Sequence, residues 1–164
     1  LKIRLSVYGE NHSRVASVYN DIGEIYSVQG DDFKALDYFK KSLKIVLSVY
    51  GENHSQVSSI YDHIGEVYFA QKDYSKALYY FEESLKIRLS LFGENHPEVA
   101  LSYYSIGSLY IIQGDKSKAL NYYEKSLKIR LSVYGENHPL TKEIMDLINV
   151  AANSKVLQSP ETTK

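Results

Sequence analysis

The hydrophobic positions of the chain recur with the period of an α-helix. Between residues 13 and 29, Tyr19, Ile22, Gly23 and Tyr26 stand at the spacing i, i+3, i+4, i+7, which places them on one helical face. A second stripe between residues 32 and 50 comprises Ala35, Leu36, Phe39, Leu43 and Leu47. The intervening Gly30 suits the end of a helix, because glycine readily adopts the left-handed conformation found there. The pattern therefore predicts two amphipathic helices joined by a short turn.

The same pattern returns at a constant interval along the chain. The tetrapeptide Gly-Glu-Asn-His begins at residues 9, 51, 93 and 135, which are 42 residues apart. A period of this length is typical of stacked helical hairpins, in which each hairpin packs only against its neighbours. The sequence predicts an all-α fold with one array over residues 1–157. Full repeats are expected at 13–50, 55–92 and 97–134.

The two ends of the chain depart from a full repeat. Residues 1–8 match the second half of a second helix, so we predict a partial helix there and expect further repeats upstream. Residues 139–157 keep a helical apolar stripe but have Met145, Asn149 and Ala152 at the tyrosine and glycine positions. This combination predicts a capping helix that covers the last repeat. The polar residues 158–164 are predicted to form a disordered tail.

Composition excludes several classes of function. The 164 residues carry a formal net charge of −1, so no overall basic field attracts nucleic acid. No apolar run approaches the roughly 18 residues of a membrane helix, and no signal peptide opens the chain. Cysteine is absent, which excludes disulfides and thiolate metal sites. We therefore expect a cytoplasmic protein without a membrane or nucleic-acid partner.

The recurring histidines His12, His54, His96 and His138 are the first candidates for chemistry. Equivalent loops of stacked helices lie about 10 Å apart, whereas metal ligands must come within about 2 Å of one zinc ion. We interpret these histidines as loop and capping residues. In addition, the residue after each histidine suits a first helical turn, either as proline or as a capping hydroxyl: Ser13, Ser55, Pro97 and Pro139.

No catalytic constellation can be assembled from the remaining residues. Neither a Ser-His-Asp nor a Cys-His arrangement is present, and there is no glycine-rich phosphate loop. His63 stands alone on a polar helix face and is interpreted as solvated. The tyrosines, 16 in all, recur with the repeat period and are interpreted mainly as core residues. We expect no enzyme, no cofactor and no metal site.

The order of residue types within each unit resembles the tetratricopeptide repeat. It runs aromatic, Ile, Gly, Tyr, Ala, aromatic and Ser. The matching residues are Tyr19, Ile22, Gly23, Tyr26, Ala35, Phe39 and Ser42; Tyr61, Ile64, Gly65, Tyr68, Ala77, Phe81 and Ser84; and Tyr103, Ile106, Gly107, Tyr110, Ala119, Tyr123 and Ser126. The long period and the Gly-x-x-His link resemble the extended subclass found in kinesin light chains and in sensor arrays of large regulatory ATPases. The resemblance implies a right-handed superhelix of antiparallel helix pairs.

A glycine inside each first helix needs a physical reason, because it costs about 0.5–1 kcal/mol relative to alanine. We expect that the glycine allows close approach of the paired helix, with Ala35, Ala77 and Ala119 as the opposing small residues. Gly65→Leu is therefore expected to destabilise the fold by several kcal/mol.

In the family, the first helices of successive repeats line the concave side of the superhelix. The resemblance therefore implies a groove formed by the faces opposite the tyrosine stripe. Its residues are Ser17, Asn20, Asp21, Glu24 and Val28; Ser59, Asp62, His63, Glu66 and Ala70; and Leu101, Tyr104, Ser105, Ser108 and Ile112. The first two sets contain four carboxylates and no Lys or Arg, whereas the third set is apolar and hydroxylic.

This polarity suggests a scaffold that binds an extended or helical segment of a partner protein. A basic part would lie over the four carboxylates, and an apolar anchor would lie near Tyr104 and Ile112. Missing groove cations argue against the C-terminal carboxylates bound by co-chaperone members and against acidic cargo peptides. On a simpler interpretation, the acids only keep the surface soluble.

Three further hypotheses concern the array as a whole. It could be a spacer or sensor segment of a larger signalling protein. It could self-associate end to end through the unpaired half-helix at residues 1–8. Near-identical tracts, such as Lys86–Ser90 and Lys128–Ser132, also suit an engineered consensus array.

Overall fold

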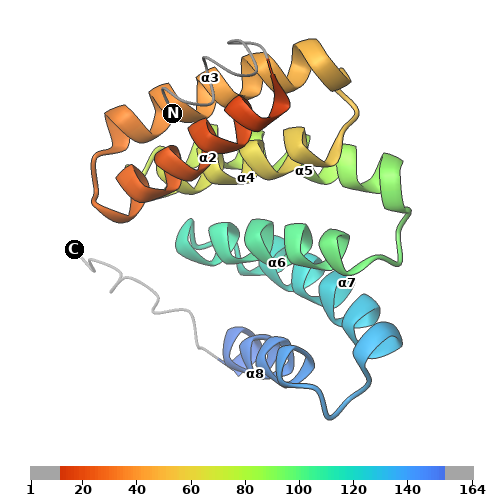
Figure 1. Cartoon of the computed structure of the whole chain (residues 1–164). Coiled ribbons are helices and arrows are strands. Elements are labelled where there is room, and N and C mark those ends of the chain that lie inside the picture. The colour runs from red at the N-terminus through yellow and green to blue at the C-terminus, as the bar shows by residue number, and fades with distance from the viewer. Residues whose placement is uncertain (1–11, 154–164) are drawn as a thin grey trace, which may run out of the picture.

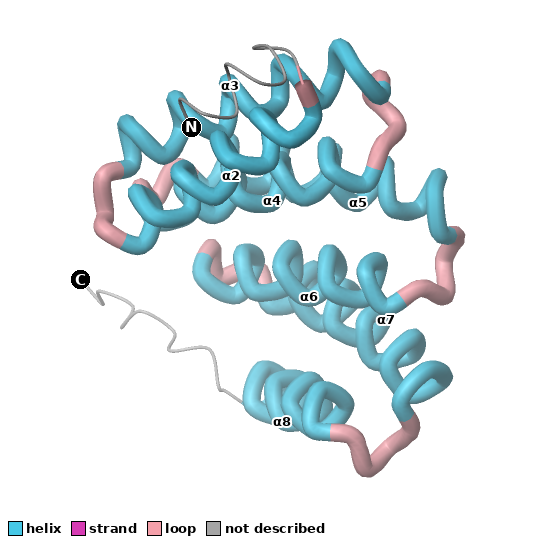
Figure 2. The backbone as a smooth tube through the Cα atoms, in the orientation of Figure 1, coloured by secondary structure: helices cyan, strands magenta, loops and turns pink. Residues whose placement is uncertain are grey.

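The computed structural model of the protein describes residues 12–153, in which every regular element is an α-helix. These helices are α2 (Ser13–Val28), α3 (Asp32–Tyr50), α4 (Ser55–Ala70), α5 (Tyr74–Phe92), α6 (Pro97–Ile112), α7 (Lys116–Tyr134) and α8 (Pro139–Asn153). Figure 1 shows them stacked in chain order, with short loops between them in Figure 2. The predicted all-α repeat fold is confirmed. The partial helix expected at 1–8 and the tail expected at 158–164 lie outside the described residues, as does the end of the predicted capping segment.

The helices pack only with near neighbours in the chain, as a solenoid requires. Helices α2 and α3, α4 and α5, and α6 and α7 form three hairpins, and each second helix also contacts the first helix of the next hairpin. Helix α8 packs on α7 in the place of a fourth first helix. Its buried Ile144, Thr141 and Ala151 complete the core beside α7.

The imidazole rings of the recurring histidines cap the first helices. The Nδ1 atoms of His54 and His96 each accept a hydrogen bond, at 3.2 Å, from the backbone N–H two residues later. Each ring also stacks on the last aromatic residue of the preceding helix, with centroids 4.2 Å apart for Tyr50–His54 and 4.4 Å for Phe92–His96. The predicted capping role is confirmed. The suggestion that Ser13 and Ser55 provide the caps is wrong, because the histidine before each serine occupies that position.

Left-handed residues end the helices. Gly51, Gly93 and Gly135 follow the second helices with φ of 79°, 76° and 78°. After the first helices, Gly30 and Gly114 have φ of 76° and 81°, and Lys72 has φ of 62° at the equivalent turn. Lys72 thus adopts the same left-handed conformation as the glycines at the other two turns, although this conformation is strained for a residue with a side chain.

The helical glycines lie against aromatic rings of the paired helix. A Cβ atom on Gly23, Gly65 or Gly107 would come within 2.6–2.7 Å of a ring carbon of Phe39, Phe81 or Tyr123, respectively. Close approach therefore explains the glycines, as predicted. The main opposing residue, however, is the aromatic one turn beyond the alanine, because the flat ring fills the space that a Cβ would occupy. That residue is Phe39, Phe81 or Tyr123.

Candidate protein-binding surface

The predicted groove residues lie on α2, α4 and α6, and their side chains connect one first helix to the next. His63 on α4 reaches Asn20 on α2, with 3.1 Å between Nδ1 and Oδ1. Tyr104 on α6 donates its hydroxyl to Glu143 on α8 at 3.2 Å. We call this side of α2, α4, α6 and α8 the first-helix surface.

A polar network joins α2 to α4 on the first-helix surface. The Asn20 amide donates to Glu24 at 2.5 Å, and Nδ1 of His63 lies 3.6 Å from the same carboxylate. The imidazole ring also lies against Phe39, with centroids 5.2 Å apart. His63 is therefore not the isolated, solvated side chain expected from the sequence. It links α4 to both helices of the first hairpin through Asn20 on α2 and Phe39 on α3.

Arg88 changes the charge expected on the second hairpin. This arginine extends from α5, and its guanidinium lies 2.7 Å from Asp62 and 3.0 Å from Glu98. Its side chain is 5% exposed, whereas that of Asp62 is 17% exposed. Burial raises the pKa of Asp62, and the Arg88 charge opposes this shift. The predicted residue set contains no Lys or Arg, but the buried Arg88 of a second helix pairs with one of its four carboxylates.

The carboxylates that stay accessible are those of Asp21, Glu24 and Glu66, all of which are exposed residues. Desolvation nevertheless raises the pKa of Glu66; His63 lowers it, and the neighbouring charges of Asp62 and Glu24 raise it further. The two neighbouring acids Asp62 and Glu24, together with Glu66 and the exposed Asp21, make the surface of α2 and α4 locally negative.

The third hairpin presents a different chemistry. The Arg130 guanidinium lies over the Tyr104 ring, 5.1 Å from its centroid, and Ser108 is 3.1 Å from the hydroxyl of Tyr123. Leu101 and Ile112 are 45% and 49% exposed. The remaining predicted residues are the half-buried Ser17 and Ser105 and the exposed Val28, Ser59 and Ala70. The surface thus changes from acidic on the first two hairpins to aromatic and apolar on the third.

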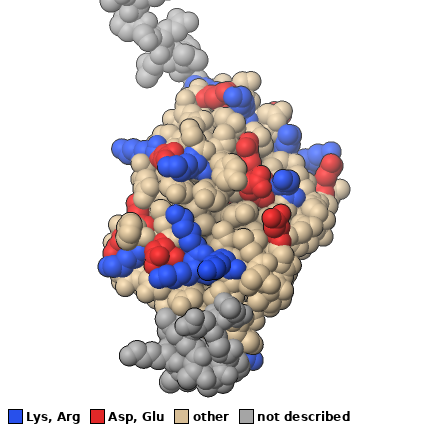
Figure 3. All heavy atoms as spheres, turned by 90° about the horizontal axis from the view of Figure 1, so that it is seen from above, with Lys and Arg blue, Asp and Glu red and all other residues tan. Residues whose placement is uncertain are grey.

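Charges elsewhere on the molecule are mixed. On the face seen in Figure 3, basic and acidic side chains are interspersed. Over residues 12–153, no group of three or more His, Asp or Glu side chains has the geometry of a metal site. Within the same residues, no helix is long and apolar enough to cross a membrane.

Comparison with known families gives a clear match. The tetratricopeptide repeat profile matches residues 14–90 and again residues 56–132, which overlap by one repeat. Comparison with curated proteins gives no match.

Several solved structures share the fold. BtubC (BKLC) from P. vanneervenii is 23% identical with a TM-score of 0.76; the alignment covers 84% of this chain and 55% of that one. A Podospora anserina protein with nearly identical TPR-like repeats, described as a kinesin light chain, is 15% identical with a TM-score of 0.75, and covers 92% of this chain and 71% of its own. The N-terminal domain of stress-induced protein-1 from C. elegans is 18% identical with a TM-score of 0.63, over 85% and 96% of the two chains. The chain thus spans about half the length of BtubC.

Proposed function

Because the chain belongs to the tetratricopeptide repeat family, we propose that its first-helix surface binds a segment of a partner protein. The fold is that of a protein-interaction scaffold, and the first-helix surface presents residues of successive repeats that a linear segment could contact together. The observation that carries the proposal is the change of chemistry along this face, which gives a bound segment both a direction and a register.

The acidic half favours a basic stretch in the partner. Asp21, Glu24 and Glu66 are exposed, and the neighbouring Asp62 is neutralised by Arg88. A lysine or arginine near Glu66 would relieve the mutual repulsion of the carboxylates, because opposite charges within a few ångströms attract.

The other half favours an apolar anchor. Leu101 and Ile112 lie on the same helix as Tyr104, and large apolar side chains exposed together on one face are typical of binding sites. A leucine or aromatic residue of the segment would be covered there. The partner segment therefore carries basic residues at one end and an apolar residue at the other.

The test is the affinity for fluorescein-labelled peptides that combine Lys and Arg with a Leu anchor, compared with acidic counterparts. We expect Asp21→Lys with Glu66→Lys to weaken binding of the basic peptides by roughly five- to tenfold, since two exposed charges contribute modestly. Glu82→Lys with Glu124→Lys is the matched control, because it makes the same charge change on exposed second-helix positions. This control should leave the affinity within about twofold.

Salt dependence separates specific from incidental attraction. Binding through exposed charges should weaken as ionic strength rises towards about 0.5 M, because salt then limits the attraction between charges to a range of only a few ångströms. Equal affinity of the wild type and the Asp21/Glu66 variant for every peptide would contradict the proposed acidic half.

Self-association is a second candidate function, favoured by exposed apolar residues of the first hairpin. Val28 is 91% exposed and Phe33 is 83% exposed, whereas the equivalents of Phe33 in the later repeats are serines. A second copy could cover both side chains end to end. Light scattering over a concentration series tests this: association should appear in the wild type and be lost on Val28→Ser with Phe33→Ser. A monomer at every concentration would eliminate the candidate.

A further inference from the structure

The junction between the second and third hairpins is built around a guanidinium. Arg88 on α5 pairs with Asp62 on α4 and Glu98 on α6, and it donates to Ser102 at 2.7 Å. Arg88 is 4% exposed, so the junction holds a buried cation with these neighbours arranged as acceptors. At the following junction the equivalent Arg130 donates to the backbone oxygen of Leu140 at 2.6 Å.

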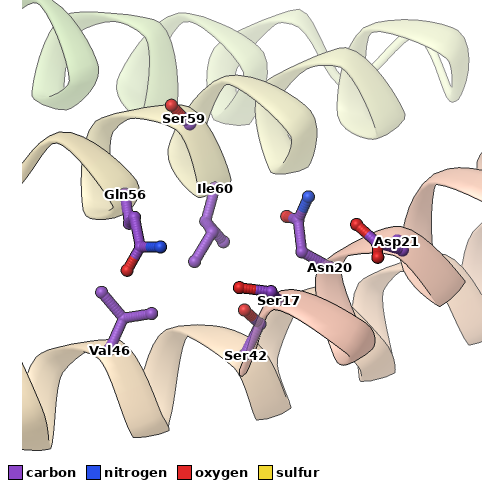
Figure 4. Close-up of a pocket in the computed structure, with 8 residues that line it drawn as sticks. All are labelled: Ser17, Asn20, Asp21, Ser42, Val46, Gln56, Ser59 and Ile60. Atoms are coloured by element: carbon purple, nitrogen blue, oxygen red, sulfur yellow. The ribbon is translucent and has the colours of Figure 1, made fainter. Parts of the chain in front are cut away.

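The junction between the first and second hairpins has different residues at the same register. One period earlier, the positions of Asp62, Arg88, Glu98 and Ser102 are occupied by Asn20, Val46, Gln56 and Ile60. Each charged residue has been replaced by a neutral one of shorter or similar length. A cavity of about 170 Å³ lies at this junction, between α2, α3 and α4, and Val46 is among its lining residues. In Figure 4, Gln56 and Ile60 extend from α4 towards Val46 on α3.

The wall of this cavity is rich in hydrogen-bond acceptors. The buried Oε1 of Gln56 has no hydrogen-bond partner among the described residues. Ser42 donates its hydroxyl to the backbone oxygen of Ala16 at 2.8 Å, and Ser17 donates to that of Ser13 at 3.3 Å. Because both hydroxyl protons are already donated, the two serine oxygens can only accept further hydrogen bonds from a ligand in the cavity.

The cavity opens on the first-helix surface. Two of its lining residues, Asp21 and Ser59, are exposed, so they form its rim, and Asp21 supplies a carboxylate there. Among the residues that the structure describes, no Lys or Arg lines the cavity. A ligand that enters from the first-helix surface therefore passes a negative charge and then meets uncharged polar groups: the serine oxygens, which accept, and the amides of Asn20 and Gln56, which both accept and donate.

We propose that this cavity binds the guanidinium of an arginine side chain from the partner segment. The inference rests on the proposed function, since it places one residue of that segment. A guanidinium carries five N–H donors in a planar fork and no acceptor, which complements the acceptors of the wall. An apolar side chain would leave Gln56 Oε1 unsatisfied, which is unfavourable for a buried polar atom.

The chain itself shows which group suits this position. The second and third junctions each bury an arginine at the register of Val46. The first junction retains the space but not the side chain. A partner arginine would therefore complete it from outside, in the way that Arg88 completes the next junction from within.

The test uses the tripeptide Ac-Ala-Arg-Ala-NH2 and its neutral counterpart with citrulline, titrated into the full 164-residue chain. The side-chain amide signals of Gln56 and Asn20 are followed by NMR. We expect saturable shifts of these signals with the arginine peptide. Affinity for the citrulline peptide should be about tenfold lower, because charged hydrogen bonds are the stronger ones.

Val46→Arg is the decisive variant, because it fills the cavity with an arginine of the chain. It should abolish the shifts while circular dichroism and the melting temperature confirm the fold. If Val46→Arg alone does not fold, a fourfold variant copies the second junction: Asn20→Asp, Val46→Arg, Gln56→Glu and Ile60→Ser. This variant lacks both reporter amides, so its binding of the arginine peptide is measured by isothermal titration calorimetry beside the wild type.

Several outcomes would overturn the proposal: no localised shifts in the wild type, equal binding of the two peptides, or undiminished binding by the filled variant. These results are distinct from failure of the proposed function. Longer peptides whose affinity still falls on substitution Glu66→Lys, at a residue outside the cavity, would leave the scaffold function standing without the arginine site. Arginine-specific shifts with no such dependence would support the cavity alone.

Discussion

At the scale of single residues, the contact between glycine and aromatic ring sets the distance between paired helices. Gly65 faces the ring of Phe81, which is 5% exposed. The aromatic ring can approach only because the glycine carries no side chain. One methyl group added at this point has to displace the ring or separate the helices.

Substitution of Gly65 should therefore destabilise the protein despite improving helix propensity. In an unhindered helix, Gly→Ala stabilises by about 0.5–1 kcal/mol. Here we expect Gly65→Ala to cost about 1–3 kcal/mol by overpacking, and Gly65→Leu to cost more. Urea unfolding measures both. Phe81→Leu in the Gly65→Ala background removes the ring carbons and should recover part of the loss; a stabilised Gly65→Ala would contradict this packing.

Arg88 is the residue that sequence reasoning missed. It belongs to a Lys-Ile-Arg-Leu tract whose lysine is exposed, so the arginine resembled another solvated cation. The position of Arg88 within the repeat could have indicated its burial. Val46 occupies the same position one repeat earlier, and a position that holds valine in one repeat is expected to be buried in the others. The partners Asp62 and Glu98 could not be assigned, because they come from two other helices.

Removal of Arg88 should be costly because it strands a buried carboxylate. We expect Arg88→Met to destabilise the protein by about 3–5 kcal/mol, as for other broken buried ion pairs. Asp62→Asn in the same background should restore much of this loss, since no charge then remains buried. Chemical denaturation of the four proteins gives the coupling energy. If the losses in the free energy of unfolding were additive, Arg88 and Asp62 would contribute to stability independently of each other.

At the scale of whole helices, the boundaries follow from local chemistry and were accessible from sequence. The Gly-Glu-Asn-His link marks the end of each second helix, and Gly30 and Gly114 mark the ends of two of the first helices. The network of His63 with Asn20 and Glu24 was not accessible, since it depends on how far α4 is rotated against α2. Periodicity fixes which face of a helix is buried but not which polar side chains meet across neighbouring helices.

The histidine caps give a prediction for the start of each first helix. His96→Ala removes both the Nδ1 acceptor and the ring that stacks on Phe92. The expected loss is about 0.5–2 kcal/mol, which is typical of a lost helix cap. His96→Asn keeps a capping acceptor without the ring, so its loss should be smaller. Thermal unfolding distinguishes the two; equal losses would mean that stacking alone matters.

Two classes of carboxylate should give opposite dependence of stability on pH. Hydrogen bonds from Lys76 lower the pKa of Asp73 at the start of α5, so its contribution to stability is lost as pH falls below about 3.8. Desolvation raises the pKa of Glu66, so its ionisation removes stability as pH rises above about 4.5.

Melting temperatures between about pH 3 and pH 7 test this difference. Glu66→Gln should raise the melting temperature near pH 7 and leave it unchanged well below pH 4.5, where both side chains are neutral. Asp73→Asn should lower the melting temperature near pH 7, with a smaller effect in acid. A change of the same sign in both variants at neutral pH would contradict these assignments.

At the scale of the whole molecule, stability is distributed along one dimension. Each hairpin contacts only its neighbours, and α8 covers the last one. A local defect should therefore open the nearest repeats before distant ones.

Ile144 on α8 provides a test, since it is fully buried against the last hairpin. Ile144→Ala should cost about 2–5 kcal/mol at this end of the array. Hydrogen exchange should accelerate in α7 and α8, with α2 and α3 much less affected. Uniform acceleration over all helices would show that the array unfolds as a single unit.

The residues at the junctions between hairpins also affect whether similar repeats pack against the correct neighbour during folding. The outer tracts of the repeats are nearly interchangeable, so a hairpin could dock beside the wrong neighbour during folding. Each interface, however, has its own residues at the equivalent positions. The first has the amide of Gln56 beside Val46, the second has Asp62 and Glu98 beside Arg88, and the third has Tyr104 beside Arg130. Skipping the middle repeat would set Glu98 of α6 against Val46 of α3, which has no charge to pair with the carboxylate. The order of assembly is thus encoded by a few interior side chains.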